Sequence, residues 1–98
     1  MSEQVTVIAR VRAKAGLEKR VREELERLLA PTRAEAGCIN YDLHESTADP
    51  RDFLFHETWQ SLAHLEAHRQ TPHLKRLREV LPPLTEGPND VTLWKKVG

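Results

Sequence analysis

Hydrophobic and polar residues alternate along four segments of the chain, a spacing typical of β-strands with one buried face. The hydrophobic members are Val5, Val7, Ala9 and Val11; Ile39, Tyr41 and Leu43; Phe53, Phe55 and Trp59; and Val91, Leu93 and Val97. Turn-forming residues at 46–51 separate the second segment from the third, so these two are expected to form an antiparallel hairpin. The pattern therefore predicts four strands.

Between the first two strands, apolar residues recur at intervals of three and four from Leu17 to Thr32. This spacing indicates an amphipathic helix with a charged outer face. Pro31 is expected to kink or restart the helix, because proline has no N–H to donate to the carbonyl four residues earlier. Gly37 suits the end of the helical region, since glycine readily adopts the left-handed conformation found there.

A second helical region lies between the third and last strands. Ser61 is expected to cap a short helix over residues 62–68, and Thr71 with Pro72 predicts the start of another, which ends at residues 82–83. The order is strand, helix, strand, strand, helix, strand. This order is the split βαβ of the ferredoxin-like α+β fold with an antiparallel sheet, and it is expected to occupy residues 1–98 as one domain.

The two faces of the predicted sheet differ in polarity. The odd-numbered strand residues are mostly apolar and are expected to lie beneath the helices. The even-numbered face combines Ile8, Leu54 and Trp94 with polar residues such as Arg10 and His56. An apolar centre inside a polar rim is typical of a surface that another protein covers. The sequence therefore predicts a homodimer formed by sheet-to-sheet packing.

Composition narrows the possible functions. The 98 residues include 15 basic and 15 acidic side chains, so no strong field attracts nucleic acid or an anionic membrane. No apolar run is as long as a membrane span, and residues 1–4 lack a signal-peptide pattern, so a cytoplasmic protein is expected. Cys38 is the only cysteine. Without a disulfide, a chain this short is expected to gain stability from an oligomer interface.

Glu57 is the anomaly of the third strand, because it occupies a helix-facing position between Phe55 and Trp59. An unpaired carboxylate buried there is costly unless it takes up a proton. One interpretation is structural, with Glu57 bonded to a helix N-terminus, a backbone amide or an arginine of a partner chain. The other is functional, with Glu57 as a pocket carboxylate of raised pKa.

His68 lies one turn from Leu65 on the inner side of its predicted helix. It could point into a cavity bounded by Trp59 and Glu57 and act there as a base or hydrogen-bond donor. A core or surface histidine without a catalytic role is the competing interpretation.

Three histidines of this region also raise the possibility of a metal site. His64 and His68 are spaced i, i+4, His73 follows, and Glu57 could add a carboxylate. Such histidine pairs arise easily by chance in a chain with five histidines, so no metal is predicted. Dinucleotide and P-loop glycine motifs, zinc-type cysteine pairs and a nucleophile elbow are all absent from the sequence.

Aromatic side chains are concentrated in the strands, at Tyr41, Phe53, Phe55, Trp59 and Trp94. Most such residues fill a core. Beneath a broken helical layer they could instead line a flat apolar pocket for an aromatic ligand.

Several segments together resemble the antibiotic biosynthesis monooxygenase superfamily, in particular its small quinol-monooxygenase-like members. The likeness is carried by residues 7–9, 13–16 and 35–38, and by the block from Phe55 to Leu74 that contains Glu57, Trp59, His68 and the segment 71–73, Thr-Pro-His. The resemblance covers nearly the whole chain.

The resemblance implies a dimeric α+β barrel with a pocket between each sheet and its helices. It also implies oxidation of a quinol or polyphenol by dioxygen without a metal, flavin or other cofactor. In that reaction Trp59 and Phe55 would pack against the substrate ring, His68 and Glu57 would handle protons, and Tyr41 could donate a hydrogen bond. His73 is placed with the substrate-binding residues.

Two other enzymes of the superfamily fit less well. The haem-degrading members resemble this fold but have an asparagine where this chain has Ala9 and a histidine where it has Arg78. An isomerase of a small hydroxy-ketone phosphate needs a phosphate site, which Arg10 or Arg12 could supply only by reaching the pocket. A non-catalytic dimeric binding domain of the same fold is the alternative outside the enzymes.

Overall fold

The computed structural model describes residues 3–98, in which all four predicted strands and both helical regions are present. The elements are β1 (Val5–Arg12), α1 (Glu18–Glu26), α2 (Leu29–Arg33), β2 (Cys38–Glu45), β3 (Asp52–Trp59), α3 (Leu62–Arg69), α4 (Pro72–Val80), a 3₁₀ turn (Pro82–Leu84) and β4 (Asp90–Trp94). The strands form one antiparallel sheet in the order β2-β3-β1-β4. The predicted ferredoxin-like α+β fold is therefore confirmed.

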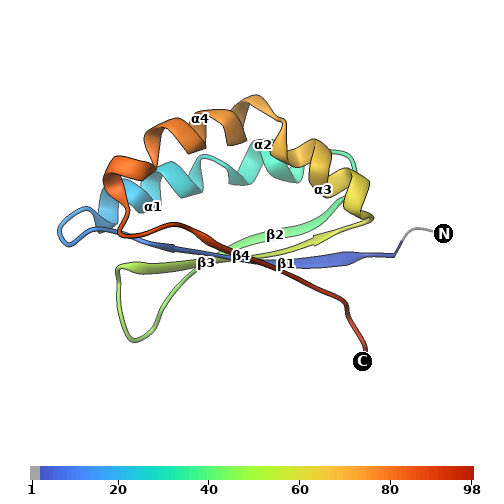
Figure 1. Ribbon diagram of the computed structural model, residues 1–98, viewed down its shortest axis with the longest axis horizontal. Helices are drawn as coiled ribbons and strands as arrows, with labels where there is room; N and C mark the ends of the chain where they lie inside the picture. Colours follow the sequence, from blue (N-terminus) through green and yellow to red (C-terminus); the bar gives the residue numbers. More distant parts are fainter. Residues whose placement is uncertain (1–2) are drawn as a thin grey trace.

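The helices all lie on one side of the sheet, and the other side is uncovered (Figure 1). β3 shows how the strand pattern produces these layers, because its residues alternate between partly exposed and buried along its whole length. In β1 and β3, the register pairs Val7 with Glu57 and Ala9 with Phe55 on the helix side, and Ile8 with His56 on the open side. The predicted division of these residues between the two faces is confirmed.

Pro31 interrupts the first helical region as predicted. α1 ends at Glu26 and α2 begins at Leu29, with the break at Arg27, four residues before the proline. A proline ring clashes with the carbonyl of that residue in a continuous helix, which explains the place of the break. Pro31 itself lies in the first turn of α2, where its missing N–H has no helical partner to lose.

The start of α3 agrees with the prediction, whereas the start of α4 differs in one detail. The Ser61 hydroxyl accepts a hydrogen bond from the His64 backbone N–H at 3.3 Å, which caps α3. Thr71 precedes Pro72 at the start of α4, but its hydroxyl donates to the His68 carbonyl at 2.7 Å and makes no cap. The side chain of Thr71 therefore ties α4 to the end of α3.

Two expectations about buried strand residues are wrong. Ile39 lies at a bulge between Cys38 and Asn40 and is 48% exposed, because an inserted residue breaks the alternation of a strand. Val91 and Leu93 are on the helix-facing side of β4 through their pairing with Ala9 and Val7, yet they are 48% and 44% exposed. β4 is an edge strand of the sheet, and these exposed fractions show that the helices leave its helix-facing side partly uncovered.

None of the helices within residues 3–98 combines the length and hydropathy needed to cross a membrane.

Candidate active site

A cavity of about 440 Å³ lies between the helix-facing side of the sheet and the helices above it. Its wall is mostly apolar, with Tyr41 and Phe55 among the aromatic members. The polar lining residues are Glu57, His68, Arg69, Gln70, Arg78 and Asn89. A small molecule of one or two rings fits a volume of this order.

Glu57 reaches the cavity from the centre of β3 and is 5% exposed. The indole Nε1–H of Trp59 donates a hydrogen bond to its Oε1 atom at 2.9 Å. Burial raises the pKa of Glu57 to about 7, and the indole bond only partly opposes that rise. Glu57 is therefore a carboxylate in the cavity wall whose protonation changes near neutral pH.

His68 lines the same cavity from α3 and is 4% exposed. Its Nδ1 atom lies 2.8 Å from Oε2 of Glu35, a residue of the turn between α2 and β2. Burial lowers the pKa of His68, and the hydrogen bond and negative charge of Glu35 oppose that effect. His68 is therefore a buried histidine in the cavity wall whose Nδ1 atom is bonded to a carboxylate.

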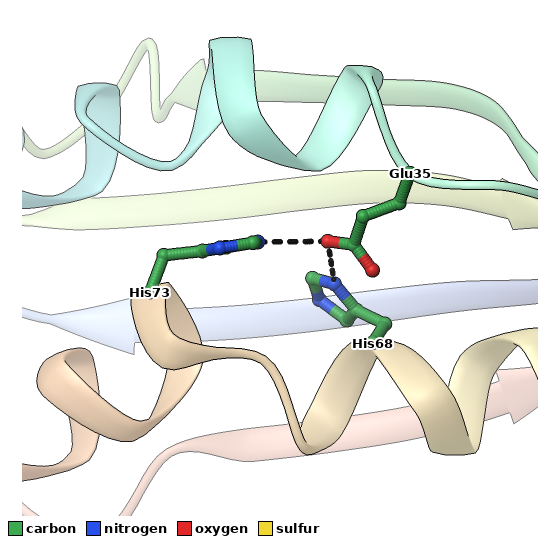
Figure 2. A group of neighbouring side chains, drawn as sticks. All are labelled: Glu35, His68 and His73. Atoms are coloured by element: carbon green, nitrogen blue, oxygen red, sulfur yellow. Dashed lines mark hydrogen bonds and ion pairs between the residues drawn. The ribbon is translucent and has the colours of Figure 1, made fainter.

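His73 joins this pair from the first turn of α4 (Figure 2). Its Nε2 atom lies 2.7 Å from the same Oε2 atom of Glu35. The sequence predicts that His73 binds substrate, but His73 does not line the cavity. Figure 2 shows His73 and His68 approaching the same oxygen of Glu35, one from α4 and the other from α3.

Three aromatic residues pack near Glu57 and His68. Tyr41 stacks on Phe55, with ring centroids 4.6 Å apart, and both rings line the cavity. Burial also raises the pKa of the Tyr41 hydroxyl, so the phenol stays protonated and can donate a hydrogen bond. Trp59 is fully buried and is not part of the lining; its ring packs against His68 at a tilt, with centroids 4.6 Å apart, and its indole N–H bonds to Glu57.

The histidine pair considered for a metal does not come together. His64 bonds to Ser61, with its Nδ1 atom 2.7 Å from the hydroxyl oxygen. The cluster that does form within residues 3–98 is Glu35, His68 and His73, whose nearest ligand-type atoms all lie within 4.8 Å of one another. Both nitrogens are at hydrogen-bond distance from one carboxylate oxygen, whereas atoms around a tetrahedral metal are about 3.3 Å apart. This geometry is that of a hydrogen-bond network.

Glu35 belongs to this site, although the sequence pattern did not predict a chemical role for it. It is 33 residues from His68 and 38 residues from His73 along the chain. No periodicity links a turn residue to two helix residues at that separation. The only signal in the sequence was the position of Glu35 within one of the segments that carry the family resemblance.

A sequence model described as "Antibiotic biosynthesis monooxygenase" matches residues 4–80. The chain belongs to the antibiotic biosynthesis monooxygenase family. Within this family, Rv0793 of Mycobacterium tuberculosis is 37% identical over 93 residues, which are 95% of this chain and 91% of that protein. The solved structure of Rv0793 superposes with a TM-score of 0.93 and covers 98% of this chain and 97% of that one.

Two further relatives differ in length and in what their names state. The "Probable quinol monooxygenase YgiN" of Escherichia coli (strain K12) is 32% identical, over 79% of this chain and 84% of that protein. The Synechocystis protein sll1783 is 36% identical over 68% of this chain. The match covers 46% of sll1783, so this chain spans about half the length of that relative.

Proposed function

We propose that this protein is a monooxygenase that oxidises a quinol or polyphenolic aromatic compound with dioxygen, using no metal or organic cofactor. The observation that carries the proposal is the presence of two proton-handling groups, Glu57 and His68, in the wall of one aromatic-lined cavity. Membership of the monooxygenase family supports it. The name of the Escherichia coli relative, a quinol monooxygenase, supports the substrate class.

The proposed reaction begins with removal of a proton from a substrate hydroxyl by His68 or Glu57. The resulting phenolate is electron-rich, so a ring carbon beside the oxygen can pass electrons to dioxygen and form a carbon–peroxide bond. The base then removes the hydrogen from that carbon, the O–O bond breaks, and one oxygen atom stays as a carbonyl while the other leaves as water. All four electrons that dioxygen accepts come from the substrate.

The cavity supplies what this sequence of steps requires. The stacked rings of Tyr41 and Phe55 give a planar substrate a flat wall. The Tyr41 hydroxyl, held in its neutral form, is a donor for developing negative charge on a substrate oxygen. Glu57, with a pKa of about 7, can remove a proton in one step and return it in another.

The test is oxygen uptake with a panel of quinols and polyphenols in a buffer freed of metals and flavins. We expect uptake above the autoxidation rate, with water rather than hydrogen peroxide as the second product. His68→Ala should abolish the enzymatic part, and Lys19→Ala, at an exposed lysine of α1, should leave it unchanged. No turnover across the panel would contradict the proposal and favour a non-catalytic binding domain.

The isomerase alternative finds less support in the site. Arg10 and Arg12 lie on the open side of the sheet, where Arg10 is exposed and Arg12 bonds to both Asp52 carboxylate oxygens at 2.8 Å. A phosphate in the cavity therefore could not reach them. The arginines that do line the cavity, Arg69 and Arg78, are bonded to Glu66 and to the carbonyl of Arg69. Conversion of a hydroxy-ketone phosphate without oxygen uptake would nevertheless favour the isomerase over the monooxygenase.

We also infer that the open face of the sheet is covered by a second copy of this chain, which gives the dimeric barrel that the family resemblance implies. Ile8 and Leu54 are partly exposed at its centre, and Trp94 is 59% exposed at its edge. Light scattering should give a dimer mass, and Ile8→Glu should reduce it to that of a monomer, because a charge cannot be buried there unpaired. A monomer mass for the unaltered protein would contradict this inference.

A further inference from the structure

One oxygen atom of Glu35 accepts two hydrogen bonds from two histidines (Figure 2). The Oε2 atom lies 2.8 Å from Nδ1 of His68 and 2.7 Å from Nε2 of His73. A carboxylate oxygen has no hydrogen to donate, so each of these nitrogens must carry one. In neutral His68 the hydrogen is therefore on Nδ1, and Nε2 carries the free electron pair.

His68 lines the cavity with its Nδ1 atom already bonded to Glu35, which leaves Nε2 as the ring nitrogen free to meet a ligand. Nε2 makes no hydrogen bond to any residue between 3 and 98. It is not fully buried either, because the one fully buried side-chain atom without a hydrogen bond in that part of the chain is Thr32 Oγ1. His68 lines the cavity, so this space is where Nε2 is accessible. The lone pair is thus on the side from which a substrate hydroxyl would approach.

We propose that Glu35 is a positioning residue, which fixes the hydrogen of His68 on Nδ1 so that Nε2 is the proton acceptor in the cavity. His73 also bonds to the Oε2 atom of Glu35 and so helps to hold the carboxylate in place. Glu35 does not contact the substrate in this arrangement, because it does not line the cavity and reaches it only through its bond to His68. Its effect on the rate rests on the proposed oxidation, but its effect on the hydrogen position does not.

The backbone around Glu35 is fixed from both sides. The N–H of Glu35 donates to the Thr32 carbonyl at 3.0 Å, and the carbonyl of Glu35 accepts from Cys38 at 3.3 Å. Gly37 follows with φ of 81°, a conformation that favours glycine. Its carbonyl accepts a 2.8 Å bond from the N–H of Gln60, the residue after β3. The turn that carries Glu35 is therefore joined to the segment that leads into α3.

The other polar groups near His68 do not replace Glu35. Arg69, its neighbour on α3, and His73 on α4 are cationic or neutral, and both lower the pKa of His68, whereas Glu35 raises it. Tyr41 approaches edge-on from β2 at 5.6 Å between ring centroids. Glu35 is thus the group that stabilises the imidazolium form when Nε2 takes up a proton.

The decisive measurement is the ¹⁵N NMR spectrum of the His68 side chain in the full chain, since the two nitrogen shifts report which atom carries the hydrogen. We expect Nδ1–H in the unaltered protein. Glu35→Ala should move the hydrogen to Nε2, the more common form in free histidine. Glu66→Gln, at an exposed glutamate on the same helix as His68, should change nothing. Hydrogen on Nε2 in the unaltered protein, or on Nδ1 in Glu35→Ala, overturns the proposal.

The pKa of His68 and the rate provide two further readouts. Glu35→Gln removes the charge but keeps the shape, so the His68 titration should move to lower pH. In Glu35→Ala, kcat should fall roughly 10²–10⁴-fold with little change in KM, because loss of the residue that orients a catalytic histidine leaves the wrong nitrogen protonated. An unchanged titration in Glu35→Gln contradicts the role of Glu35. An Nδ1–H form in a protein that turns over no quinol supports the role of Glu35 and contradicts the proposed oxidation.

Discussion

Two buried glutamates, in different regions of the molecule, have pKa values shifted in opposite directions. Glu24 on α1 is 3% exposed and Glu57 on β3 is 5% exposed. The carboxylate of Glu24 lies 2.6 Å from a guanidinium nitrogen of Arg76 on α4, and this bond is the largest cause that lowers its pKa. Glu57 receives only an indole N–H, and burial raises its pKa to about 7.

Two carboxylates of similar exposure therefore differ in charge state, because the bond to a guanidinium dominates at Glu24 and burial dominates at Glu57. A guanidinium stabilises the charged form of Glu24, so this residue stays ionised and links α1 to α4. A neutral donor leaves the charge of Glu57 poorly compensated, so its protonation changes near neutral pH. One carboxylate therefore serves the scaffold, and the other is available for proton transfer.

The largest expected difference between the two residues is in the reaction rate. Glu57→Gln keeps the shape of the side chain but removes its ability to accept a proton, so kcat/KM for quinol oxidation should fall about 10²–10⁴-fold. Glu24→Gln should leave kcat/KM unchanged. Steady-state oxygen uptake measures both. Equal rates for Glu57→Gln and the unaltered protein would show that Glu57 is not a catalytic group.

The next expected difference is in the pH dependence of stability. The pKa of Glu57 is raised in the folded protein, from an ordinary 4.5 to about 7. Its contribution to the free energy of unfolding is therefore complete below pH 4.5 and is lost as the pH rises through 7. Relative to Glu57→Gln, the unaltered protein should lose about 3 kcal/mol of unfolding free energy across this range. Urea denaturation at a series of pH values measures the difference, and a flat difference would contradict the raised pKa.

The smallest expected effect is on the stability contributed by Glu24, whose pH dependence is opposite to that of Glu57. The pKa of Glu24 is lowered in the folded protein. Its contribution to the free energy of unfolding is therefore present above the ordinary pKa of 4.5 and is lost as the pH falls below that value. At neutral pH, Glu24→Gln should cost about 1 kcal/mol of unfolding free energy, because Arg76 is partly exposed and its charge is screened by solvent. In the same urea experiments, a cost that grows toward low pH would contradict the ion pair.

The fold was predictable because its signals are local. The alternation in β3 places Glu57 on the helix side from the sequence alone, and Ser61 and Pro31 mark helix boundaries by their own backbone chemistry. The errors arise where the pattern depends on neighbours. Ile39 is exposed because a bulge shifts its strand, and Val91 is half exposed because the helices leave its edge strand uncovered.

The site was predictable only in part, for the same reason. Glu57 and His68 could be chosen because each is a polar residue at an apolar position of its own element. Glu35 could not, since its role depends on three separate segments meeting in space. Trp59 and His73 were expected against the substrate, yet one supports Glu57 and the other holds Glu35, because the packing of α3 and α4 decides which side chains reach the cavity.

The backbone bond between Gly37 and Gln60 has a consequence for how this protein can change. It couples the turn of Glu35 to the start of the helix that carries His68 without using any side chain of the cavity wall. Less buried lining residues such as Leu74 and Val91 can therefore be exchanged without altering that coupling. Divergent evolution, or a designed library at these positions, can thus reshape the cavity while Glu35 and His68 keep their relative positions.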